Sequence, residues 1–363
     1  MRRRPAVVLG ASGLVGQRMQ QRLANHPWFE LAAIGGSAAS AGKSLDEIPW
    51  RLEQERPPLP QVQVLEILGE SFVKELQTLG IEVAFSCLPS DVANQIEPVL
   101  VNCGIAVFSN ASSFRRELGI PLVIPDINSE HMSEFNSSKG MHACATNCTL
   151  VPMAVPIAAL RQWDVIKVSM RSEQALSGAG WKLLEDEDAR NGYPNPEIPG
   201  EAEKVVQEFL HVMGEGGEDG IVPATIEVDV KCQRIGRRDG HQVFVEVEFK
   251  QPITQQEIIL ALKNHDWSQQ LKLCPSTPLR PIHLVDEIDV DNHLWSDGIQ
   301  FSSSPLPSQS LKTGMAVVVG NVQVKGQHNL VFSAYSHNTI RGASGGTLLL
   351  AEQAIIEDRI PER

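Results

Sequence analysis

Short apolar runs alternate with helical patterns through the first 150 residues. The runs cover residues 6–9, 29–34, 83–86, 106–109 and 122–124, and each ends in a segment rich in Gly, Ser, Pro or Asn. Apolar runs of this length, separated by amphipathic stretches, predict buried parallel strands joined by helices. We therefore expect an α/β fold that begins with a Rossmann-type doubly wound sheet, whose ligand binds at the carboxyl ends of the strands.

The pattern changes after residue 163 to long stretches in which apolar and polar residues alternate. They cover residues 163–176, 225–235, 241–250 and 315–324, with a loop over 177–200 and a helical pattern over 201–213. Strict alternation is typical of half-buried strands, so we expect a second, α+β domain built on a mainly antiparallel sheet.

These patterns divide the chain into three parts. We expect a dinucleotide-binding domain over residues 1–147 and a catalytic, substrate-binding and dimerisation domain over 148–337. Residues 338–363 are expected to form a C-terminal helix that returns to the dinucleotide-binding domain. Residues 264–312 receive no structural assignment.

A glycine turn follows the first predicted strand. Gly10, Gly13 and Gly16 precede a helical pattern that starts with Leu14 and Val15. Strand, glycine turn and helix form the context of a dinucleotide fingerprint, because the backbone and the helix N-terminus can approach a pyrophosphate. The spacing is GxxGxxG rather than GxGxxG, so a plain tight turn remains the alternative.

The end of the second predicted strand bears on the choice of cofactor. An NAD site usually has an acidic residue there, which binds the ribose 2′-OH. This chain has Ser37, Ser40 and Lys43 instead, and hydroxyls and a lysine could bind a 2′-phosphate. We therefore expect NADP, with NAD as the alternative. Flexible loop residues are the other interpretation of this segment.

Composition and charge exclude several classes of protein. The chain has 363 residues, 42% of them apolar, and a net charge of −13, which argues against nucleic acid as a main partner. It has neither an apolar stretch of about 20 residues nor a signal-peptide core, so we expect no membrane span. Six cysteines without a CxxC pair are typical of a reduced, cytoplasmic protein. No metal-ligand spacing is present, so we expect no metal.

Cys148 is the candidate nucleophile. It follows Asn147, a favourable N-cap residue, and precedes an apolar helical pattern. A cysteine at a helix start feels the positive end of the helix dipole, which lowers the pKa of the thiol and favours thiolate. It also falls where the two domains meet, a common position for a cleft. Cys144 has none of these features, and we interpret it as a core residue.

A thiolate nucleophile needs a partner that handles protons, and His241 is the candidate. It begins a predicted strand, seven residues after Arg234, and a hairpin of the two flanking strands would bring these side chains together. Glu201 and Lys204 are three residues apart on a predicted helix, a spacing that by itself indicates a solvated salt bridge.

Taken together, the motifs resemble those of the aspartate-β-semialdehyde dehydrogenase family, especially its archaeal and fungal type. The resemblance spans almost the whole chain and rests on GASGLVGQ, SAGKS, FSCLPSDVA, VFSNASSFR, PLVIPDIN, TNCTLVP, EQALSGAGW, IPGEAEK, CQR followed by DGH, GMAVVVG and HNTIRGASGGTLLLAE. It implies NADP-dependent, reversible reduction of L-4-aspartyl phosphate to L-aspartate 4-semialdehyde, in lysine, threonine and methionine biosynthesis.

The same resemblance implies a role for each candidate residue. Cys148 would attack the aldehyde to give a thiohemiacetal, which loses hydride to become a thioester that phosphate cleaves. His241 would be the acid/base, and Gln174 would orient the substrate. Arg234 would grip the substrate carboxylate, a task suited to its planar fork, and Glu201 would face the ammonium group. The phosphate-binding positions would be Lys204, Arg115 and Asn147.

The resemblance also implies the cofactor contacts and the assembly. We expect the dinucleotide to be bound by Gly10, Ser12, Gly13, Leu14, Val15, Gly16, Ser37, Ser40, Ser86 and Asn338. For Ser86, at a predicted strand end, ordinary turn chemistry is the alternative. The expected partners are the small-molecule substrate, phosphate and further copies of the chain, as a homodimer or homotetramer.

Three competing functions stay open at this point. A related thioester reductase such as malonyl-CoA reductase would keep Cys148 and His241 but would not need Lys204 and Arg115. N-acetyl-glutamyl-phosphate reductase acts on a substrate without a free ammonium group for Glu201. A catalytically silent nucleotide-binding homologue would not need its nucleophile and acid/base residues.

Overall fold

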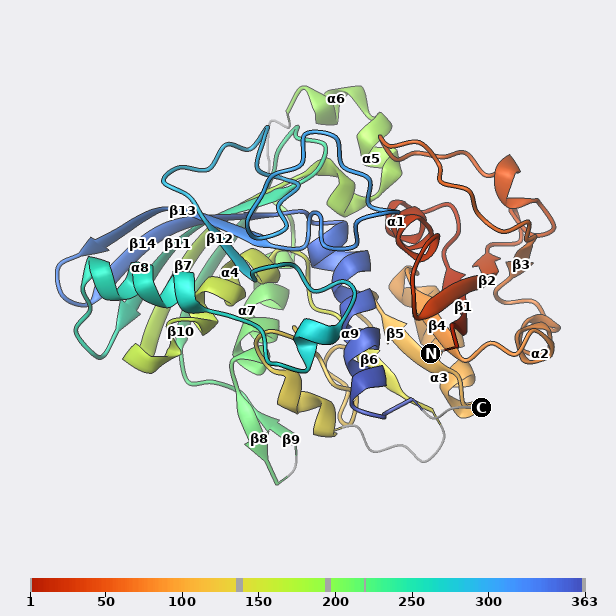
Figure 1. Cartoon of the computed structure of the whole chain (residues 1–363), viewed down its shortest axis with the longest axis horizontal. Helices are drawn as coiled ribbons and strands as arrows, with labels where there is room; N and C mark the ends of the chain where they lie inside the picture. The colour runs from red at the N-terminus through yellow and green to blue at the C-terminus, as the bar shows by residue number, and fades with distance from the viewer. Residues whose placement is uncertain (1, 135–139, 193–196, 219, 361–363) are drawn as a thin grey trace.

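A computed structural model describes residues 2–134, 140–192, 197–218 and 220–360 of the chain (Figure 1). Its first sheet has six strands, all parallel, in the order β3-β2-β1-β4-β5-β6. The strands are β1 (Arg4–Leu9), β2 (Phe29–Gly36), β3 (Val64–Glu66), β4 (Val83–Ser86), β5 (Ala106–Ser109) and β6 (His142–Cys144). The order runs outward in both directions from β1, so the predicted doubly wound sheet is confirmed.

Helices cover both faces of this sheet. Ala6 and Val8 of β1 pack in one core cluster with helix α1 (Leu14–Leu23) and helix α9 (Gly345–Ile356). Val7 and Leu9 point to the other face, toward helices α2 (Phe72–Thr78) and α3 (Ser90–Asn102). Alternate residues of a strand thus pack into the cores on opposite faces of the sheet. Because both faces are covered, the strands are apolar at every position. The C-terminal helix lies against the first sheet.

Two details of this sheet differ from the sequence prediction. Residues 122–124 do not form a strand of the sheet, and only Leu122 makes an isolated bridge, to Cys144. The edge strand is β6 instead, three residues that pair with β5. Strand β3, at the opposite edge, was not predicted from the sequence. Both edge strands are too short for a periodic pattern to reveal them.

The second sheet has six strands in the order β10-β7-β11-β14-β13-β12. They are β7 (Val165–Gln174), β10 (Glu227–Arg234), β11 (His241–Phe249), β12 (Ile282–Leu284), β13 (Val317–Lys325) and β14 (Asn329–Ser336). Three of the pairings, β7 with β11, β11 with β14 and β14 with β13, are antiparallel, so the mainly antiparallel sheet is confirmed. Helices α4 (Leu150–Ala158), α7 (Glu201–Val212) and α8 (Gln255–Asn264) share one core cluster with it.

The predicted hairpin between β10, which ends at Arg234, and β11, which begins at His241, is wrong. Strand β10 pairs with β7 in parallel, and β11 pairs with the other edge of β7. Arg234 and His241 still meet, because both flank the carboxyl end of β7. The predicted loop over 177–200 contains two short helices, α5 (Trp181–Glu185) and α6 (Glu187–Arg190), and its residues 193–196 lie outside the described residues.

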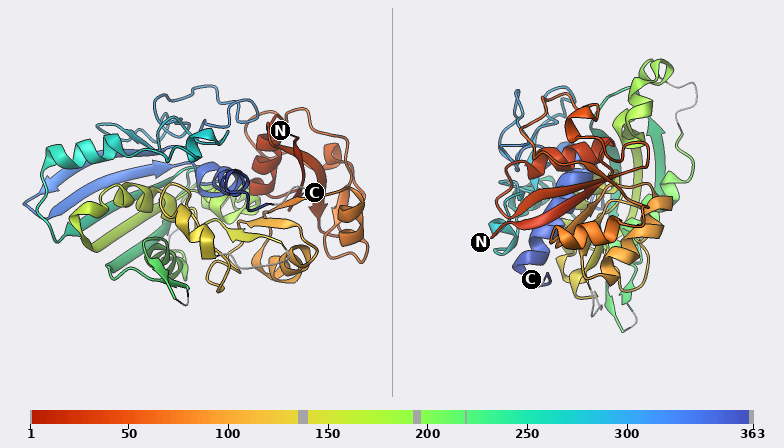
Figure 2. Two further views of the ribbon diagram at one scale, coloured as in Figure 1. Left: turned by 60° about the horizontal axis from the view of Figure 1, so that its bottom comes forward. Right: turned by 90° about the vertical axis from the view of Figure 1, so that its right-hand side faces the viewer.

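The remaining elements complete the arrangement. Strands β8 (Glu215–Gly217) and β9 (Gly220–Val222) form a separate two-stranded sheet. Figures 1 and 2 show the two large sheets side by side along the long axis of the molecule, with α9 between them.

The division of the chain at residues 147 and 337 stays a prediction. In the described part of the chain, no helix has the length and apolarity needed to cross a bilayer.

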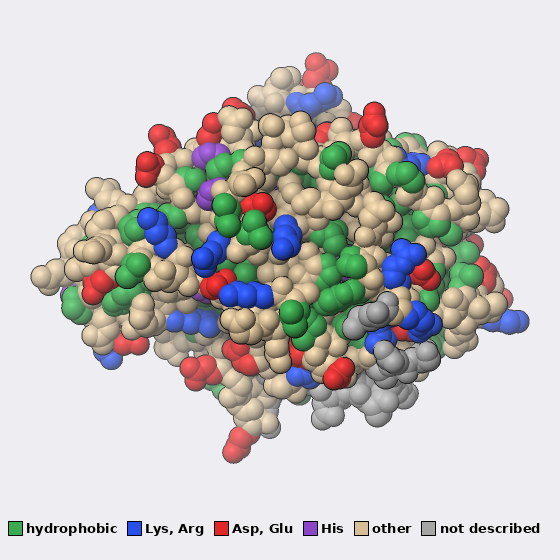
Figure 3. Space-filling model, viewed as in Figure 1, with side chains coloured by type: hydrophobic (Ala, Val, Ile, Leu, Met, Phe, Trp, Pro, Cys, Tyr) green, Lys and Arg blue, Asp and Glu red, His purple; other side chains and the backbone are tan. Residues whose placement is uncertain are grey.

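Charged side chains of both signs are interspersed over the face of the molecule drawn in Figure 3. The 13 excess negative charges of the sequence are thus not gathered into one acidic patch on that face. Local positive sites can therefore exist in a protein of net negative charge.

The glycine turn gives a test of the fold. A methyl group at Gly16 would lie 2.0 Å from the carbonyl oxygen of Gly10, whereas one at Gly13 would come no closer than 3.6 Å to it. Gly16→Ala should lower the free energy of unfolding by about 1–3 kcal/mol or more through overpacking. Gly13→Ala is the matched control and should cost less, about 1 kcal/mol at most, for a poorer N-cap. Urea denaturation of both variants measures the difference, and equal stability of the two would contradict this account.

Candidate active site

The site is built around one contact between the two halves of the chain. Cys148 lies just beyond β6 of the first sheet, and His241 is the first residue of β11 in the second. The sulfur of Cys148 lies 3.3 Å from Nε2 of His241. The structure therefore brings together the predicted nucleophile and its predicted partner.

The helix after Cys148 begins later than predicted. Helix α4 starts at Leu150, and Cys148 lies in the turn before it. The side-chain oxygen of Asn147 accepts a hydrogen bond from the N–H of Thr149 at 2.8 Å, so Asn147 caps this turn rather than the helix. The thiol is therefore not inside the first turn of α4, where the dipole acts most strongly.

The expected low pKa of the thiol is also not observed. Burial raises the pKa of the Cys148 thiol to about 11, and the carboxylate of Glu201 acts in the same direction. The positive charges of Arg115 and Arg234 oppose this shift but do not overcome it. Burial disfavours the charged form of a thiol more than these cations favour it. In this structure Cys148 is therefore a neutral thiol at pH 7.

His241 is neutral as well. Burial lowers the pKa of its imidazole to about 3, and the positive charge of Arg234 lowers it further. The N–H of Ala175 donates a hydrogen bond to Nδ1 of His241 at 3.1 Å. An Nδ1 that accepts a hydrogen bond leaves the ring proton on Nε2. His241 thus presents an N–H donor to the sulfur of Cys148.

The end of β7 holds the other residues around this pair. Gln174 is buried at the end of β7 and lies opposite Arg234 in the parallel pairing of β7 with β10. Nη1 of Arg234 donates a hydrogen bond to the carbonyl of Ala175 at 2.7 Å. Arg234 and His241 therefore hold the carbonyl and the N–H of the same residue. Sequence patterns gave no sign of this role for Ala175, because its backbone N–H and carbonyl, and not its side chain, make these hydrogen bonds.

A buried network supports the turn that carries Cys148. Glu208 accepts hydrogen bonds from Arg115 Nη1 at 2.8 Å and from the backbone N–H of Asn147 at 2.6 Å. Nδ2 of Asn147 donates to Glu201 at 2.8 Å. Glu208 was not predicted from the sequence, although it lies one and two helical turns from Lys204 and Glu201 and so shares their face of the helix. A buried carboxylate needs such partners.

Lys204 is exposed in the first turn of α7. It makes no ion pair with Glu201 or with any other residue that the structure describes. The solvated salt bridge suggested by their spacing is therefore absent from the described contacts, and Glu201 is held by Asn147 instead.

A cavity of about 680 Å³ lies at the carboxyl ends of β1, β2 and β4. Six of the predicted cofactor residues line it: Gly10, Ser12, Gly13, Leu14, Val15 and Ser37. This volume is typical of ligand sites. Gly10, with φ of +100°, and Gly13, which has no side chain toward the cavity it lines, allow a close approach to the backbone, so the cavity fits a dinucleotide.

The other four predicted cofactor residues do not line this cavity. Gly16 packs against Gly10 in the turn, and Ser40 donates a hydrogen bond to the carbonyl of Ser37 at 2.9 Å. Ser86 is buried at the end of β4. Asn338 is buried and donates to the hydroxyl of Ser177, which lines the cavity, at 2.8 Å. These four are therefore placed to shape the site from behind.

Sequence patterns missed several residues of the cavity wall. Cys87 lines the cavity at the end of β4, and burial raises the pKa of its thiol to about 12. Gly178 and Trp181, which follow β7 of the second sheet, also line it. A methyl group at Gly178 would lie 3.1 Å from Nε2 of His241. One residue of the cavity wall therefore lies next to His241.

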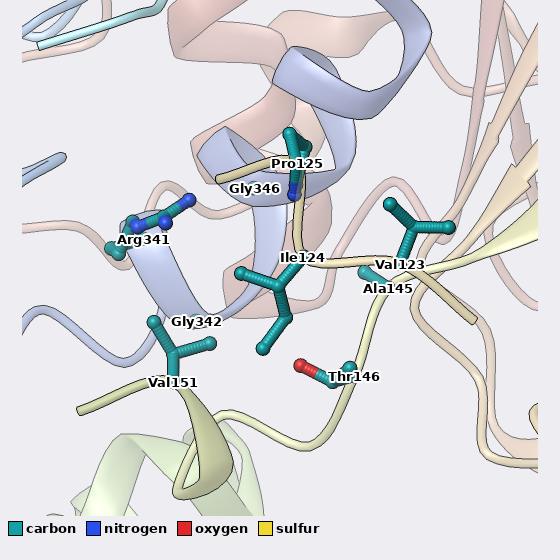
Figure 4. Close-up of a pocket in the computed structure, with 9 residues that line it drawn as sticks. All are labelled: Val123, Ile124, Pro125, Ala145, Thr146, Val151, Arg341, Gly342 and Gly346. Carbon is teal, nitrogen blue, oxygen red and sulfur yellow. The ribbon is translucent and has the colours of Figure 1, made fainter. Parts of the chain in front are cut away.

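A second, very small cavity lies behind the Cys148 turn (Figure 4). Its volume of about 10 Å³ is at the lower limit for one water molecule. Thr146 and Val151, on either side of Cys148 in the chain, border it together with Gly342. A methyl group at Gly342 would lie 2.7 Å from Cβ of Cys148, so this glycine lets the C-terminal segment pack directly against Cys148.

Comparisons with known proteins agree with this geometry. Residues 5–135 match the family described as semialdehyde dehydrogenase, NAD binding domain. The chain is 33% identical over 374 residues to an aspartate-semialdehyde dehydrogenase of Aspergillus fumigatus, covering 97% of each protein. It is 32% identical to that of Archaeoglobus fulgidus, covering 96% of this chain and 97% of the relative.

The chain belongs to the aspartate-semialdehyde dehydrogenase family. The likeness extends to the fold: a crystal structure of the Candida albicans aspartate-semialdehyde dehydrogenase with NADP superposes with a TM-score of 0.79 at 28% identity, covering 98% of this chain and all of that one. The chain is thus an oxidoreductase of this family, with an NAD(P)-binding domain at its N-terminus.

The charge of Glu201 gives a test of the candidate site. Because that carboxylate raises the pKa of the Cys148 thiol, Glu201→Gln should lower the pKa and increase the thiolate fraction. The glutamine keeps an oxygen for Asn147. Alkylation of Cys148 by iodoacetamide at pH 8, followed by peptide mass spectrometry, should become about threefold faster. Glu203→Gln, an exposed change on the same helix, is the control and should leave the rate unchanged. Slower alkylation of the Glu201 variant would contradict this assignment.

Proposed function

We propose that this chain catalyses the reversible, NAD(P)-dependent conversion of L-4-aspartyl phosphate to L-aspartate 4-semialdehyde through a thioester on Cys148. The observation that carries the proposal is the 3.3 Å contact between Cys148 Sγ and His241 Nε2, beside a cavity that fits a dinucleotide. Full-length similarity to aspartate-semialdehyde dehydrogenases supports the choice of substrate. The reaction belongs to aspartate-family amino-acid biosynthesis.

The proposed chemistry starts with the sulfur of Cys148. As thiolate it attacks the acyl carbon of aspartyl phosphate, and the bond to phosphate breaks to leave a thioester. The bound nicotinamide supplies the hydride that reduces this carbonyl. The resulting thiohemiacetal then releases the aldehyde and returns the sulfur as thiolate.

The N–H of His241 is placed to donate a hydrogen bond to the sulfur, or to a negative oxygen that develops on an acyl group bound to it. The ring takes up a proton at Nε2 only when Nδ1 carries the other one. That arrangement conflicts with the N–H of Ala175, which already donates to Nδ1. The proposed acid/base role therefore requires the Ala175 contact to open as substrate binds.

Substrate charge offers a way to ionise the thiol. In the proposal the ammonium group of the substrate faces Glu201, and this cancels a charge that raises the pKa of Cys148. The substrate carboxylate is assigned to Arg234, and Gln174 orients the acyl group. Phosphate is assigned to Lys204, Arg115 and Asn147, and the exposure of Lys204 supports its part in this role.

The finer points of the proposal rest on the sequence resemblance. These are a homodimer or homotetramer, the cytoplasm as location, and NADP rather than NAD as the cofactor. The NADP of the Candida albicans structure supports the last point by analogy with that protein.

A direct assay tests the proposed reaction. The protein should reduce NAD or NADP when it is mixed with aspartate semialdehyde and phosphate, as followed by the absorbance of the reduced cofactor. Cys148→Ser should lower kcat by at least about 10³-fold, because the covalent route is lost. Malonyl-CoA with reduced cofactor is the comparison substrate. Activity with malonyl-CoA alone would overturn the substrate assignment, and near-normal turnover by Cys148→Ser would overturn the mechanism.

A further inference from the structure

The dinucleotide cavity has no cation among the described residues that line it. A dinucleotide carries a negative charge on each phosphate of its pyrophosphate, which in a doubly wound sheet lies over the glycine turn and the start of the first helix. Here that place is the turn over residues 10–16 and the N-terminus of α1. Backbone N–H groups serve it, and a guanidinium beside the turn would add charge-assisted hydrogen bonds. A cation that serves the pyrophosphate must therefore come from just outside this wall.

Arg51 places a guanidinium at this turn. It belongs to the segment between β2 and β3, which reaches across to α5, the short helix that follows β7 (Figure 1). Its Nη1 donates a hydrogen bond to the carbonyl of Ser12 at 3.5 Å, and its guanidinium lies 4.0 Å from the ring centroid of Trp181. Ser12 and Trp181 both line the cavity. Arg51 therefore lies between two parts of the wall, one that follows β1 and one that follows β7.

The present hydrogen bonds of this guanidinium are weak. Nη1 donates to the carbonyls of Pro49 and Ser12 at 3.4 and 3.5 Å, beyond the usual range of about 2.7–3.2 Å. Nε is buried and has no hydrogen-bond partner among the described residues, and the carboxylate of Glu185, 3.6 Å away, is 62% exposed. An exposed ion pair at that distance contributes little. The guanidinium is thus held by stacking, while its donors can serve a stronger acceptor such as a phosphate oxygen.

The backbone of Arg51 is fixed on both sides. Its N–H donates to the side-chain oxygen of Gln17 at 2.8 Å, and its carbonyl accepts from Nη2 of Arg238 at 2.7 Å. Gln17 is buried in α1, the helix that begins at the glycine turn, and its own amide donates to the carbonyl of Pro49 at 2.7 Å. These bonds set where the side chain of Arg51 starts relative to α1, so the guanidinium is pre-organised beside the turn.

We propose that Arg51 binds the pyrophosphate of the dinucleotide, with the ring of Trp181 holding its guanidinium in place. The planar fork of an arginine donates two parallel hydrogen bonds to phosphate oxygens while its face stacks on an aromatic ring. The inference rests on the proposed function for the presence of a dinucleotide and deepens it by naming a residue that binds it. Because NAD and NADP share the pyrophosphate, Arg51 serves both cofactors alike.

Equilibrium binding tests this inference without catalysis. Isothermal titration of the purified chain with NAD⁺ and with NADP⁺ should show that Arg51→Ala raises both dissociation constants by about tenfold, because charged hydrogen bonds to the pyrophosphate are lost. Arg51→Lys keeps the charge but loses the fork, and should raise both by about threefold. Ethylguanidinium added to the Arg51→Ala protein should restore part of the affinity, and ethylammonium should restore less.

A double-mutant cycle tests the part played by the ring. Trp181→Leu should weaken binding of both dinucleotides less in the Arg51→Ala protein than in the unmodified one, because the ring acts through the guanidinium. Additive effects of the two substitutions would overturn this part of the proposal.

Lys182→Gln is the matched control. Lys182 is exposed, and its Nζ lies 5.9 Å from the centroid of the same ring, outside the cavity wall. Its loss removes one positive charge from the same neighbourhood and should leave both dissociation constants within about twofold of their values in the unmodified protein. Equal effects of Lys182→Gln and Arg51→Ala would indicate a general field of charge and overturn the assignment of Arg51.

Other results separate the inference from the function beneath it. Unchanged binding of both cofactors by Arg51→Ala, or weakening confined to NADP⁺, would overturn the contact with the pyrophosphate and leave the proposed function intact. Binding of neither dinucleotide by the unmodified protein would overturn both.

Discussion

The contact between Cys148 and His241 depends on how the two sheets are held together. Cys148 follows the edge strand of the parallel sheet, and His241 begins a central strand of the mixed sheet. Their 3.3 Å separation therefore exists only when both sheets are docked. The C-terminal segment fixes this docking, because Gly342 packs on the backbone of Cys148 and α9 continues into the core of the first sheet. Any sequence change that shifts this segment should therefore also shift the sulfur of Cys148.

The environment of the pair disfavours a charge on either group. Burial raises the pKa of Cys148 and lowers that of His241, so both groups are neutral in the absence of ligand. Glu201 on one side and Arg115 and Arg234 on the other then set how easily the thiol ionises. A substrate that carries both an ammonium and a carboxylate group would change this balance.

Local patterns in the sequence predicted much of the fold. The strands β4 and β5 were predicted to the residue, and β1, β2, β7 and β11 to within a few residues, because each has a strong apolar period. Strand pairing was harder: the predicted hairpin of β10 and β11 is in fact two strands that flank β7. Pairing is decided by contacts distant in sequence, which no local period encodes.

The candidate site, like the fold, was predicted only in part from the sequence. The sequence predicted that Cys148 and His241 act together, and the structure brings them into contact, but it does not give the thiol the predicted low pKa, because burial raises that pKa. Glu208 was missed, since it looks like one polar residue of an amphipathic helix. Ala175 acts through its backbone, which no residue type reveals.

The most direct measurement is the capture of the acyl group on the sulfur. The protein is incubated with aspartate semialdehyde and oxidised cofactor, without phosphate, then quenched in acid and mapped by peptide mass spectrometry. The account predicts reduced cofactor in an amount equal to the enzyme and an aspartyl group on the peptide that contains Cys148. Acylation at another residue, or cofactor reduction with Cys148 unmodified, would contradict it.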